Sequence, residues 1–542
     1  MKTCTHGIPK EMNHMRKTSL YLSIVILNLF STSIWSAVTV LDPSQRRVDQ
    51  PAPTPPNPIV VDNAKRLLAD NWVVENMSEL NRTLHPVMKH PQNPIFKPEK
   101  PWEKPAVLLF GTVMYDPQRD EDKFRMWYLC FTPQFSEDFS QRKNKNGCIA
   151  YAISRDGIHW KRPNLGIHDY EGSKDNNIVI TGAPDSNSII HDPLDPDLNR
   201  RYKAHVRNAG RHLAYFSPDG IHWTKHGRIN IDGNDRSTVH WDPLRRHWFA
   251  TTKSNYKTAS GDIRRGRGYQ ESQDFLHWGP VSFLCATPET APDFVYNLEP
   301  FYYESMFLGI WGRYTAEPDA LLDIQLAVSH NGRHWERPSH EPWIPLAPLP
   351  KDFQREKKPY ITPVTGVDPS DPSVPWDYGN NSGSALGPVR VGDQLWMYYS
   401  GRKTDHRSKP HIGAIGLGTL RLDGFFSLDA GETEGTLLTR PLRLVHKNLH
   451  VNANVAGGQL YVEIVDLSGK PIPPFTRKNC VPVTTDSVRH QIQWRGTDDL
   501  SPVLEKTVRL RFTMKKTEIY AFWTGQEHRW HTPDTTVWKW AR

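Results

Sequence analysis

The sequence predicts an all-β chain, a five-bladed β-propeller followed by a C-terminal β-sandwich, on three observations. A seven-residue phrase recurs four times in the middle of the chain, and its tryptophans are 63, 55 and 57 residues apart. Strand-like runs flank short turns at a similar interval, and the 45 Pro and 35 Gly favour turns over long helices. A fixed period indicates a repeat architecture, and about 55–63 residues accommodate the four short strands of a propeller blade.

The recurring phrase fits a tight turn followed by a strand. It reads Ser-Arg-Asp-Gly-Ile-His-Trp at 154–160 and Ser-Pro-Asp-Gly-Ile-His-Trp at 217–223, with weaker copies at 272–278 and 329–335. Gly supplies a positive φ, Ser and Asp can bond the backbone of the turn, and Trp packs as an apolar anchor. One histidine per copy suggests a metal, but equivalent positions in separate blades lie far apart. We therefore expect structural roles on the outer rim for the four histidines (His159, His222, His277 and His334).

Five strand–turn–strand units predict the five blades. Three of the turns begin with Asp-Pro, which we interpret as turn chemistry rather than as catalytic carboxylates. The units pair 107–115 with 124–130, 188–192 with 201–205, 238–242 with 247–250, 300–304 with 306–311, and 384–391 with 394–399.

The last part of the chain has a different pattern. After Gly424, short alternating runs with turn signals indicate an antiparallel sandwich. Upstream of the repeats, 46–58 is Pro-rich and predicts a linker, and 60–68 fits either one short helix or an edge strand with a turn. The expected domains are a signal peptide at 1–37, a linker and N-terminal extension at 38–94, the propeller at 95–424 and the sandwich at 425–542.

The N-terminus has the features of a secretory signal. Lys10, Arg16 and Lys17 form a basic flank, 19–35 is largely apolar, and small residues at 33–37 suit cleavage. We expect a secreted or periplasmic protein, with an uncleaved membrane anchor as the alternative. No other stretch is long and apolar enough to span a membrane.

The composition limits the classes of binding partner that we expect for this protein. The net charge of +8 is spread along the chain without a long basic block, so nucleic acid is a poor candidate. The Arg-Arg-Gly-Arg run at 264–267 predicts an exposed hairpin, and the alternative is a contact with a sulfated or uronic polymer. Four cysteines lie after the expected signal peptide, at 130, 148, 285 and 480, and their spacing is not that of a metal site. We expect either a Cys130–Cys148 disulfide or buried free thiols. No nucleotide or flavin motif is present.

The turn phrase Ser-x-Asp-Gly-x-x-Trp, residues 415–425 and the strand–turn–strand at 457–473 carry a resemblance to a known group. They resemble the five-bladed propeller glycoside hydrolases of the invertase, levansucrase and arabinanase type, families 32, 43 and 68. The phrase also resembles the Asp-box of sialidases, although it is one residue shorter. The resemblance implies a glycan substrate and leaves room for an axial calcium ion, although no ligand cluster in the sequence identifies a metal site or another cofactor.

The sequence also lacks several motifs of that group. Invertase-type enzymes carry their nucleophile in an Asn-Asp-Pro-Asn-Gly phrase, and this phrase is absent here, as are their Arg-Asp-Pro and Glu-Cys phrases. Cleavage of sucrose or fructan by the standard residues is therefore not expected, and the chain looks like a divergent branch.

Candidate site residues lie just before the innermost strand of each blade, because ligands of propellers bind on the axis at one mouth of the channel. Glycoside hydrolysis needs a proton donor and a second carboxylate as base or nucleophile. We expect Glu299, among apolar neighbours, to be the donor, Asp235 the base or nucleophile, and Asp377 a third acid. Arg236 would hold an anionic group. The other predicted substrate contacts are Asp185 and the stacking rings of Trp102, Trp376 and Tyr378.

Each acid also has a structural interpretation. Asp235 fits a turn, Glu299 a buried acid bonded to backbone amides, and Asp377 a loop cap. The leading hypothesis is an exported glycoside hydrolase that acts on a plant or algal poly- or oligosaccharide. A carbohydrate-binding propeller without catalysis is the alternative, and a protein scaffold, which predicts an apolar groove, is the third.

Overall fold

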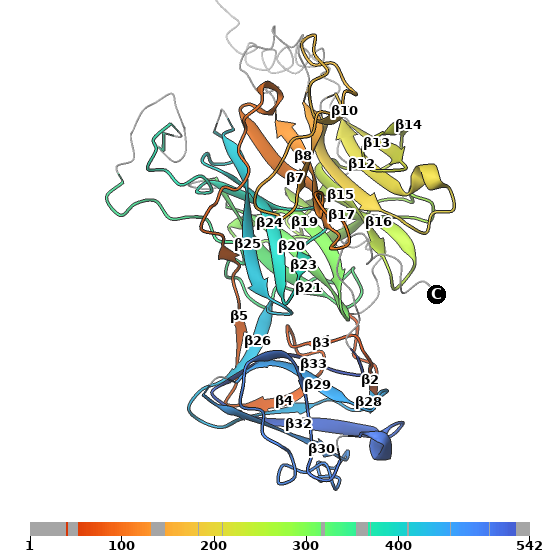
Figure 1. Cartoon of the computed structure of the whole chain (residues 1–542), viewed down its shortest axis with the longest axis vertical. Coiled ribbons are helices and arrows are strands. Elements are labelled where there is room, and N and C mark those ends of the chain that lie inside the picture. Colours follow the sequence, from red (N-terminus) through yellow and green to blue (C-terminus); the bar gives the residue numbers. More distant parts are fainter. Residues whose placement is uncertain are drawn as a thin grey trace, which may run out of the picture. The chain divides into compact units, whose positions relative to one another are not determined.

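The computed structural model describes residues 40–41, 52–131, 147–182, 184–208, 210–315, 320–353, 367–368, 370–408, 411–455, 457–497 and 499–526 (Figure 1). All of them belong to the compact unit Val38–Arg542, and the expected signal peptide lies outside them. Strands and short 3-10 turns form the regular structure of this part, as predicted. None of its helices has the length and apolar character to cross a membrane.

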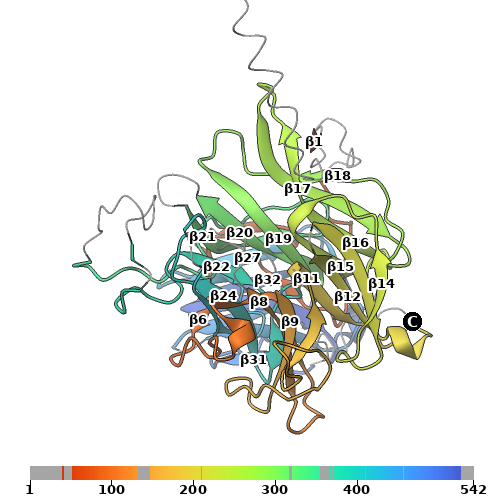
Figure 2. The same ribbon diagram turned by 90° about the horizontal axis from the view of Figure 1, so that it is seen from above.

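The propeller has the five predicted blades, which follow one another around a ring in Figure 2. Blade 1 contains β7 (Ala106–Tyr115), β8 (Phe124–Phe131), β9 (Cys148–Ser154) and β10 (Ile178–Thr181). Blade 2 contains β11 (Pro184–His191), β12 (Tyr202–Asn208), β13 (Arg211–Ser217) and β14 (Thr224–Arg228). Blade 3 contains β15 (Asn234–Asp242), β16 (His247–Lys257), β17 (Ile263–Ser272) and β18 (Ser282–Cys285).

The last two blades are less regular. Blade 4 contains β19 (Asp293–Tyr303), β20 (Met306–Thr315) and β21 (Leu321–Ser329), with isolated bridges from Ile344 and Glu336 along its outer edge. Blade 5 contains β22 (Asn380–Gly383), β23 (Val389–Val391), β24 (Gln394–Arg402) and β25 (Gly413–Arg421). The N-terminal part supplies β6 (Met88–Lys89), which pairs with β25, and β1 (Val40–Leu41), which pairs with β16.

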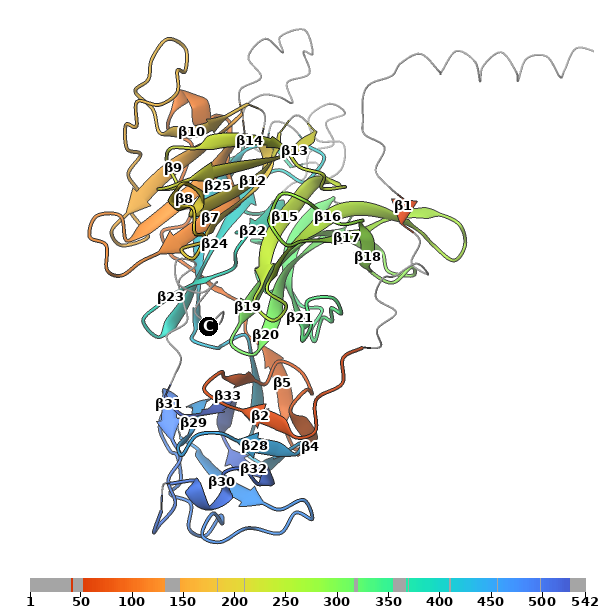
Figure 3. The same ribbon diagram turned by 90° about the vertical axis from the view of Figure 1, so that its right-hand side faces the viewer.

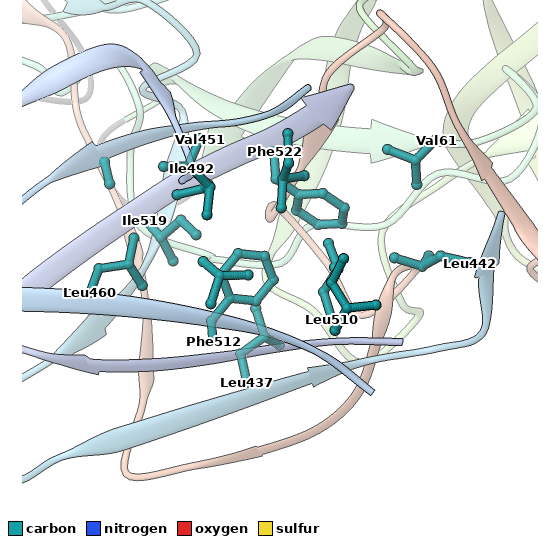
Figure 4. Packing of buried hydrophobic residues seen from close by; sticks show 14 of the residues in the cluster. Val61, Leu437, Leu442, Val451, Leu460, Ile492, Leu510, Phe512, Ile519 and Phe522 are labelled. Atoms are coloured by element: carbon teal, nitrogen blue, oxygen red, sulfur yellow. The ribbon is translucent and has the colours of Figure 1, made fainter. Parts of the chain in front are cut away.

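Two six-stranded sheets form the sandwich around one apolar core. One sheet contains β2 (Ile59–Val61), β4 (Val74–Ser78), β27 (Gly435–Thr439), β28 (Leu442–Leu444), β30 (Gln459–Val465) and β32 (Thr507–Lys515). The other contains β3 (Arg66–Leu67), β5 (Asn81–Leu84), β26 (Phe426–Ala430), β29 (Leu449–Asn454), β31 (Ser487–Gln491) and β33 (Thr517–Thr524). Figure 4 shows Leu437, Leu510, Phe512 and Phe522, all fully buried, in this core.

The N-terminal segment differs from the expected linker and extension. Four of its strands complete the two sandwich sheets, as Figure 3 shows for β2, β4 and β5 beside the late strands. Residues 60–68 form strand ends and a turn rather than a helix. Strands of two to five residues carry too little periodicity to show their partners, which lie more than 300 residues away in the sequence.

The recurring phrase folds as predicted, and its histidines are structural. At 217–223 the Ser217 hydroxyl accepts from the Gly220 amide at 2.9 Å, and Asp219 accepts from the Ile221 and His222 amides at 2.8 Å. The exposed His222 ring contacts Asp219 at 2.7 Å. The copy at 154–160 repeats all of these bonds, and the copy at 272–278 repeats those of the aspartate. In the third copy Phe275 replaces glycine at a φ of 72° and fills the blade core, where it is fully buried.

A buried ion pair joins the sandwich to the propeller. Lys65, fully buried, places Nζ 2.8 Å from Asp423 Oδ2. Asp423 also accepts from Asn452 at 2.8 Å and from the Tyr303 hydroxyl at 2.7 Å. The Lys65 amide donates to Glu304 at 3.0 Å. Residues of the N-terminal segment, blade 4 and the sandwich therefore all bind the carboxylate of Asp423, and both of its oxygens are used.

Cys130 and Cys148 lie opposite each other on β8 and β9, and both are buried. They are free thiols here, as are Cys285 and Cys480. Of the two alternatives left by the sequence, the structure shows the buried thiols.

Candidate active site at the propeller mouth

Four of the five innermost strands are irregular near their start. The pairing register shifts between Leu108 and Thr112 in β7, between Pro184 and Ser186 in β11, between Asn234 and Thr238 in β15, and between Val295 and Asn297 in β19. Such bulges re-aim side chains and occur next to active sites more often than elsewhere. Asp235 and Arg236 lie within the bulge of β15, and Glu299 lies two residues after that of β19.

Arg236 occupies the bulge of β15 in an unfavourable backbone conformation. Its φ is 56°, and the residue is buried. The backbone is held from two sides, since the Arg236 amide donates to Ser186 Oγ at 2.7 Å and its carbonyl accepts from Arg267 at 2.7 Å. The guanidinium lies 3.8 Å from the centre of the Phe110 ring and forms an ion pair with Glu299. Strain of this kind persists where surrounding contacts impose it, and it is common at functional sites.

Glu299, on β19, is buried with its side chain only 1% exposed. One carboxylate oxygen, Oε1, accepts from Arg236, whereas Oε2 has no hydrogen-bond partner among the described residues. Burial raises the pKa of Glu299 to about 7, against the opposing effects of Arg236 and Arg267. Near neutral pH this group therefore exists in both the protonated and the ionised form.

Asp235 has the opposite environment. Its side chain is 34% exposed and its Oδ1 lies 2.5 Å from Lys253 Nζ. Burial acts to raise the pKa of Asp235, but Lys253 and then Arg265 outweigh it and lower that pKa to about 2. Asp235 is therefore a carboxylate at any pH near neutrality.

Charged and aromatic side chains surround Tyr296. The Arg265 guanidinium lies 4.2 Å from the Tyr296 ring and donates to the Tyr296 carbonyl at 2.8 Å. The rings of His406 and Tyr314 lie 4.8 and 6.1 Å from it. The charges of Asp235, Arg265, Arg236 and Arg402 all act on this tyrosine. We call the following set the mouth cluster: Arg207, Asp235, Arg236, Lys253, Arg265, Arg267, Tyr296, Glu299, Tyr314, Arg402 and His406.

Three of the predicted site residues, Asp235, Arg236 and Glu299, belong to the mouth cluster. Asp377 is instead buried in blade 5, where it accepts from Lys89 at 2.6 Å and from the Tyr399 hydroxyl at 3.0 Å. These contacts give Asp377 a role in joining β6 to β24, and a role in substrate chemistry stays a prediction.

The three predicted aromatic contacts pack against residues of the blades, and Trp376 is the one that stays half-buried. Trp102 is buried and donates to Asn177 at 2.9 Å. Trp376 packs on Tyr399, with ring centres 5.4 Å apart, and Tyr378 is buried with Val367 and Val374. Large rings just before inner strands serve the core here, which sequence position alone does not distinguish. The side chain of Asp185 lies outside the part that the structure describes.

The sequence reasoning missed most cations of the mouth cluster. Lys253 and Arg402 come from the second strands of blades, whereas the sequence prediction covers only the starts of the innermost strands. The run at 264–267 lies in a hairpin as predicted, that of β16 and β17, but it is not exposed, because Arg264 and Arg265 are half-buried and Arg267 is fully buried. Alternation along β17 was the available signal, because residues two apart on a strand share a face.

The surroundings of Glu299 do not fit the axial calcium ion that the resemblance leaves room for. A calcium site needs several oxygen ligands, with carboxylates among them. Glu299 already binds a guanidinium, and Arg267 acts on it as a second positive charge. Among the described residues, no group of three or more His, Cys, Asp or Glu is arranged to hold a metal.

Comparisons with known proteins find similarity in structure only. No protein-family profile and no curated protein matches the chain. An N-acetylgalactosamine deacetylase from F. plautii, solved with blood group B trisaccharide, is 13% identical, with a TM-score of 0.41, over 64% of this chain and 97% of that one. A β-1,2-mannobiose phosphorylase from Listeria innocua is 14% identical, with a TM-score of 0.38, over 62% and 98%. A glycosyl hydrolase from Bacteroides ovatus is 12% identical, with a TM-score of 0.38, over 66% and 97%.

Proposed function

We propose that this protein is a glycoside hydrolase whose reaction takes place at the mouth cluster. The observation that carries the proposal is a pair of carboxyl groups, on neighbouring inner strands, whose pKa values are moved in opposite directions. That of Glu299 is raised to about 7 and that of Asp235 is lowered to about 2. Two acids held in different protonation states are what acid–base cleavage of a glycosidic bond requires.

The roles follow from the two environments. Protonated Glu299 donates its proton to the glycosidic oxygen as the bond to the anomeric carbon breaks. Ionised Asp235 acts on the anomeric carbon, either directly as a nucleophile or by taking a proton from the attacking water. Arg236 touches Glu299 and holds its carboxylate in place, and the half-buried Tyr314 offers a ring for the sugar. An exported location and a plant or algal glycan as substrate belong to the same proposal.

The first test is a hydrolysis screen of the purified protein against a broad polysaccharide panel, beside Glu299→Gln. Glutamine preserves the shape of the side chain but cannot donate the proton, so we expect a loss of activity of about a hundredfold or more. Glu463→Gln is the matched control, because Glu463 is a buried acid of the sandwich that pairs with Arg511. Equal activity of wild type and Glu299→Gln would remove Glu299 from the mechanism.

A second candidate function is carbohydrate binding without catalysis. The observation that favours it is the burial of Glu299, whose side chain is 1% exposed and already paired with Arg236. A substrate has to reach this acid for hydrolysis but not for binding. Retention of glycans by the wild type and by Glu299→Gln alike, with no product released from either, would establish the binding function in place of the enzyme.

A further inference from the structure

The mouth cluster contains more positive than negative side chains. Lys253, Arg265 and Arg207 all act on the single carboxylate of Asp235. Deeper in the cluster, Arg236 and Arg267 act on the carboxyl group of Glu299. The described residues thus place several cations around two carboxyl groups that the proposed reaction itself uses.

The two cations nearest to solvent are held in position. Lys253 is one quarter exposed and fixed by its 2.5 Å contact with Asp235. The Arg265 guanidinium lies 4.2 Å from the centre of the Tyr296 ring and donates one NH2 group to the Tyr296 carbonyl. Arg265 and Lys253 are both half-buried, so each still reaches solvent. A guanidinium is a fixed fork of donors that suits a planar or tetrahedral oxyanion, and a lysine beside it adds a second positive charge.

Crowding of like charges adds to the effect of burial in this cluster. Burial and then the charge of Arg265 lower the pKa of Lys253. Burial and then Arg402 and Arg265 lower the pKa of His406 to about 3, so His406 adds no charge near neutral pH. A bound anion beside Lys253 and Arg265 would offset this repulsion, because opposite charges attract strongly where water is partly excluded.

We infer that the glycan carries an oxyanion, a carboxylate or a sulfate ester on a sugar, that binds Lys253 and Arg265 beside the scissile bond. This inference rests on the proposed function, because it places the anion on the substrate of that reaction. It excludes purely neutral glycans as the preferred ligands. It also gives the 264–267 run a role in substrate choice, through a strand residue rather than through an exposed hairpin.

Binding of small acidic sugars tests the inference without turnover. We would titrate the wild-type protein by calorimetry with glucuronate, galacturonate and galactose 6-sulfate, each beside its neutral parent, glucose or galactose, at constant ionic strength. At least one acidic sugar should bind at least tenfold more tightly than its parent. If every acidic sugar binds no better than its parent, the inference is wrong.

Variants locate the site. Arg265→Gln and Lys253→Gln should each weaken binding of the acidic sugar tenfold or more and leave binding of the neutral parent unchanged. Arg477→Gln, in an exposed sandwich ion pair with Glu434, is the matched control and should bind as the wild type does. Undiminished binding in both Arg265→Gln and Lys253→Gln, with thermal unfolding showing that they are folded, would overturn the assignment.

A last titration distinguishes an anion that is part of a sugar from a free inorganic anion. Inorganic phosphate and sulfate are titrated in the same way. Tight binding of the free ion that excludes every acidic sugar would overturn the inference in favour of an ionic co-substrate. Binding of an acidic sugar by a protein that cleaves nothing would keep the anion site and remove only the proposed hydrolysis.

Discussion

Two buried ion pairs in this molecule have similar charges but different surroundings. Lys65 and Asp423, at the junction of sandwich and propeller, share a network in which both oxygens of Asp423 accept hydrogen bonds. Arg236 and Glu299, at the mouth, leave Glu299 Oε2 and Arg236 Nε without partners in the described structure. Arg236 also has a positive φ. A buried pair that is fully bonded fixes a structure, whereas one that is incompletely bonded and strained has capacity left for a ligand.

The largest expected effect comes from breaking the junction pair. Asp423→Ala leaves the Lys65 ammonium buried without its partner, and the free energy of unfolding should fall by about 3–5 kcal/mol. Urea unfolding at neutral pH measures the loss. Glu434→Gln, which breaks the exposed pair with Arg477, should change it by less than about 1 kcal/mol. Equal losses in the two variants would show that burial of the Lys65 pair adds nothing.

The mouth pair should respond to pH in the opposite sense from a stabilising carboxylate. The pKa of Glu299 is higher in the folded protein, about 7, than its usual 4.5. The folded state therefore binds more protons between these values, and stability falls as pH rises through this window, by about 3 kcal/mol at most. Glu299→Gln should remove this slope, as measured by urea unfolding of both proteins at pH 5 and pH 8. A slope that persists in the variant would assign the pH dependence to other groups.

The pH dependence of kcat/KM should reveal the role of the second carboxylate, Asp235. If Asp235 is the base or nucleophile, kcat/KM falls on the acid side as Asp235 becomes protonated, near its pKa of about 2. Lys253→Met removes the first of the cations that lower this pKa. The acid limb should then move up by about one pH unit, or about 1.4 kcal/mol. The limb above neutral pH, which reports Glu299, should stay in place, and movement of both limbs together would contradict separate roles for the two acids.

The smallest effect belongs to the exposed pairs of the repeated turns. His222 contacts Asp219 at 2.7 Å, but its side chain is 67% exposed. His222→Gln should cost less than about 1 kcal/mol in thermal or urea unfolding, since water screens such pairs. A loss as large as that of Asp423→Ala would mean that the turn, and not burial, decides the strength of a pair.

The blades and their turns could be predicted because they depend on local chemistry. Ser217, Asp219 and Gly220 satisfy the backbone of their own turn, so their spacing alone predicts it. Glu299 and Asp235 were found because inner strands start at a known place in a propeller. Lys253 and Arg265 were not, because they reach the mouth through pairing across β16 and β17, which depends on register. Trp102 and Asp377 lie at the expected sequence positions, but the direction of their side chains is set by packing.

The strands from the beginning of the chain make the sandwich depend on the order of synthesis. β5 ends at Leu84, and its partner sheet is complete only when β33, which ends at Thr524, has been made. At about 5–20 residues per second, the ribosome needs roughly 20–90 s for the intervening stretch of about 440 residues. For most of that time β4 and β5 have no partners, because their partner strands β26 and β27 end only at Ala430 and Thr439. The nascent chain thus carries open strand edges for most of its translation, and a chaperone that covers them would raise the yield of folded protein.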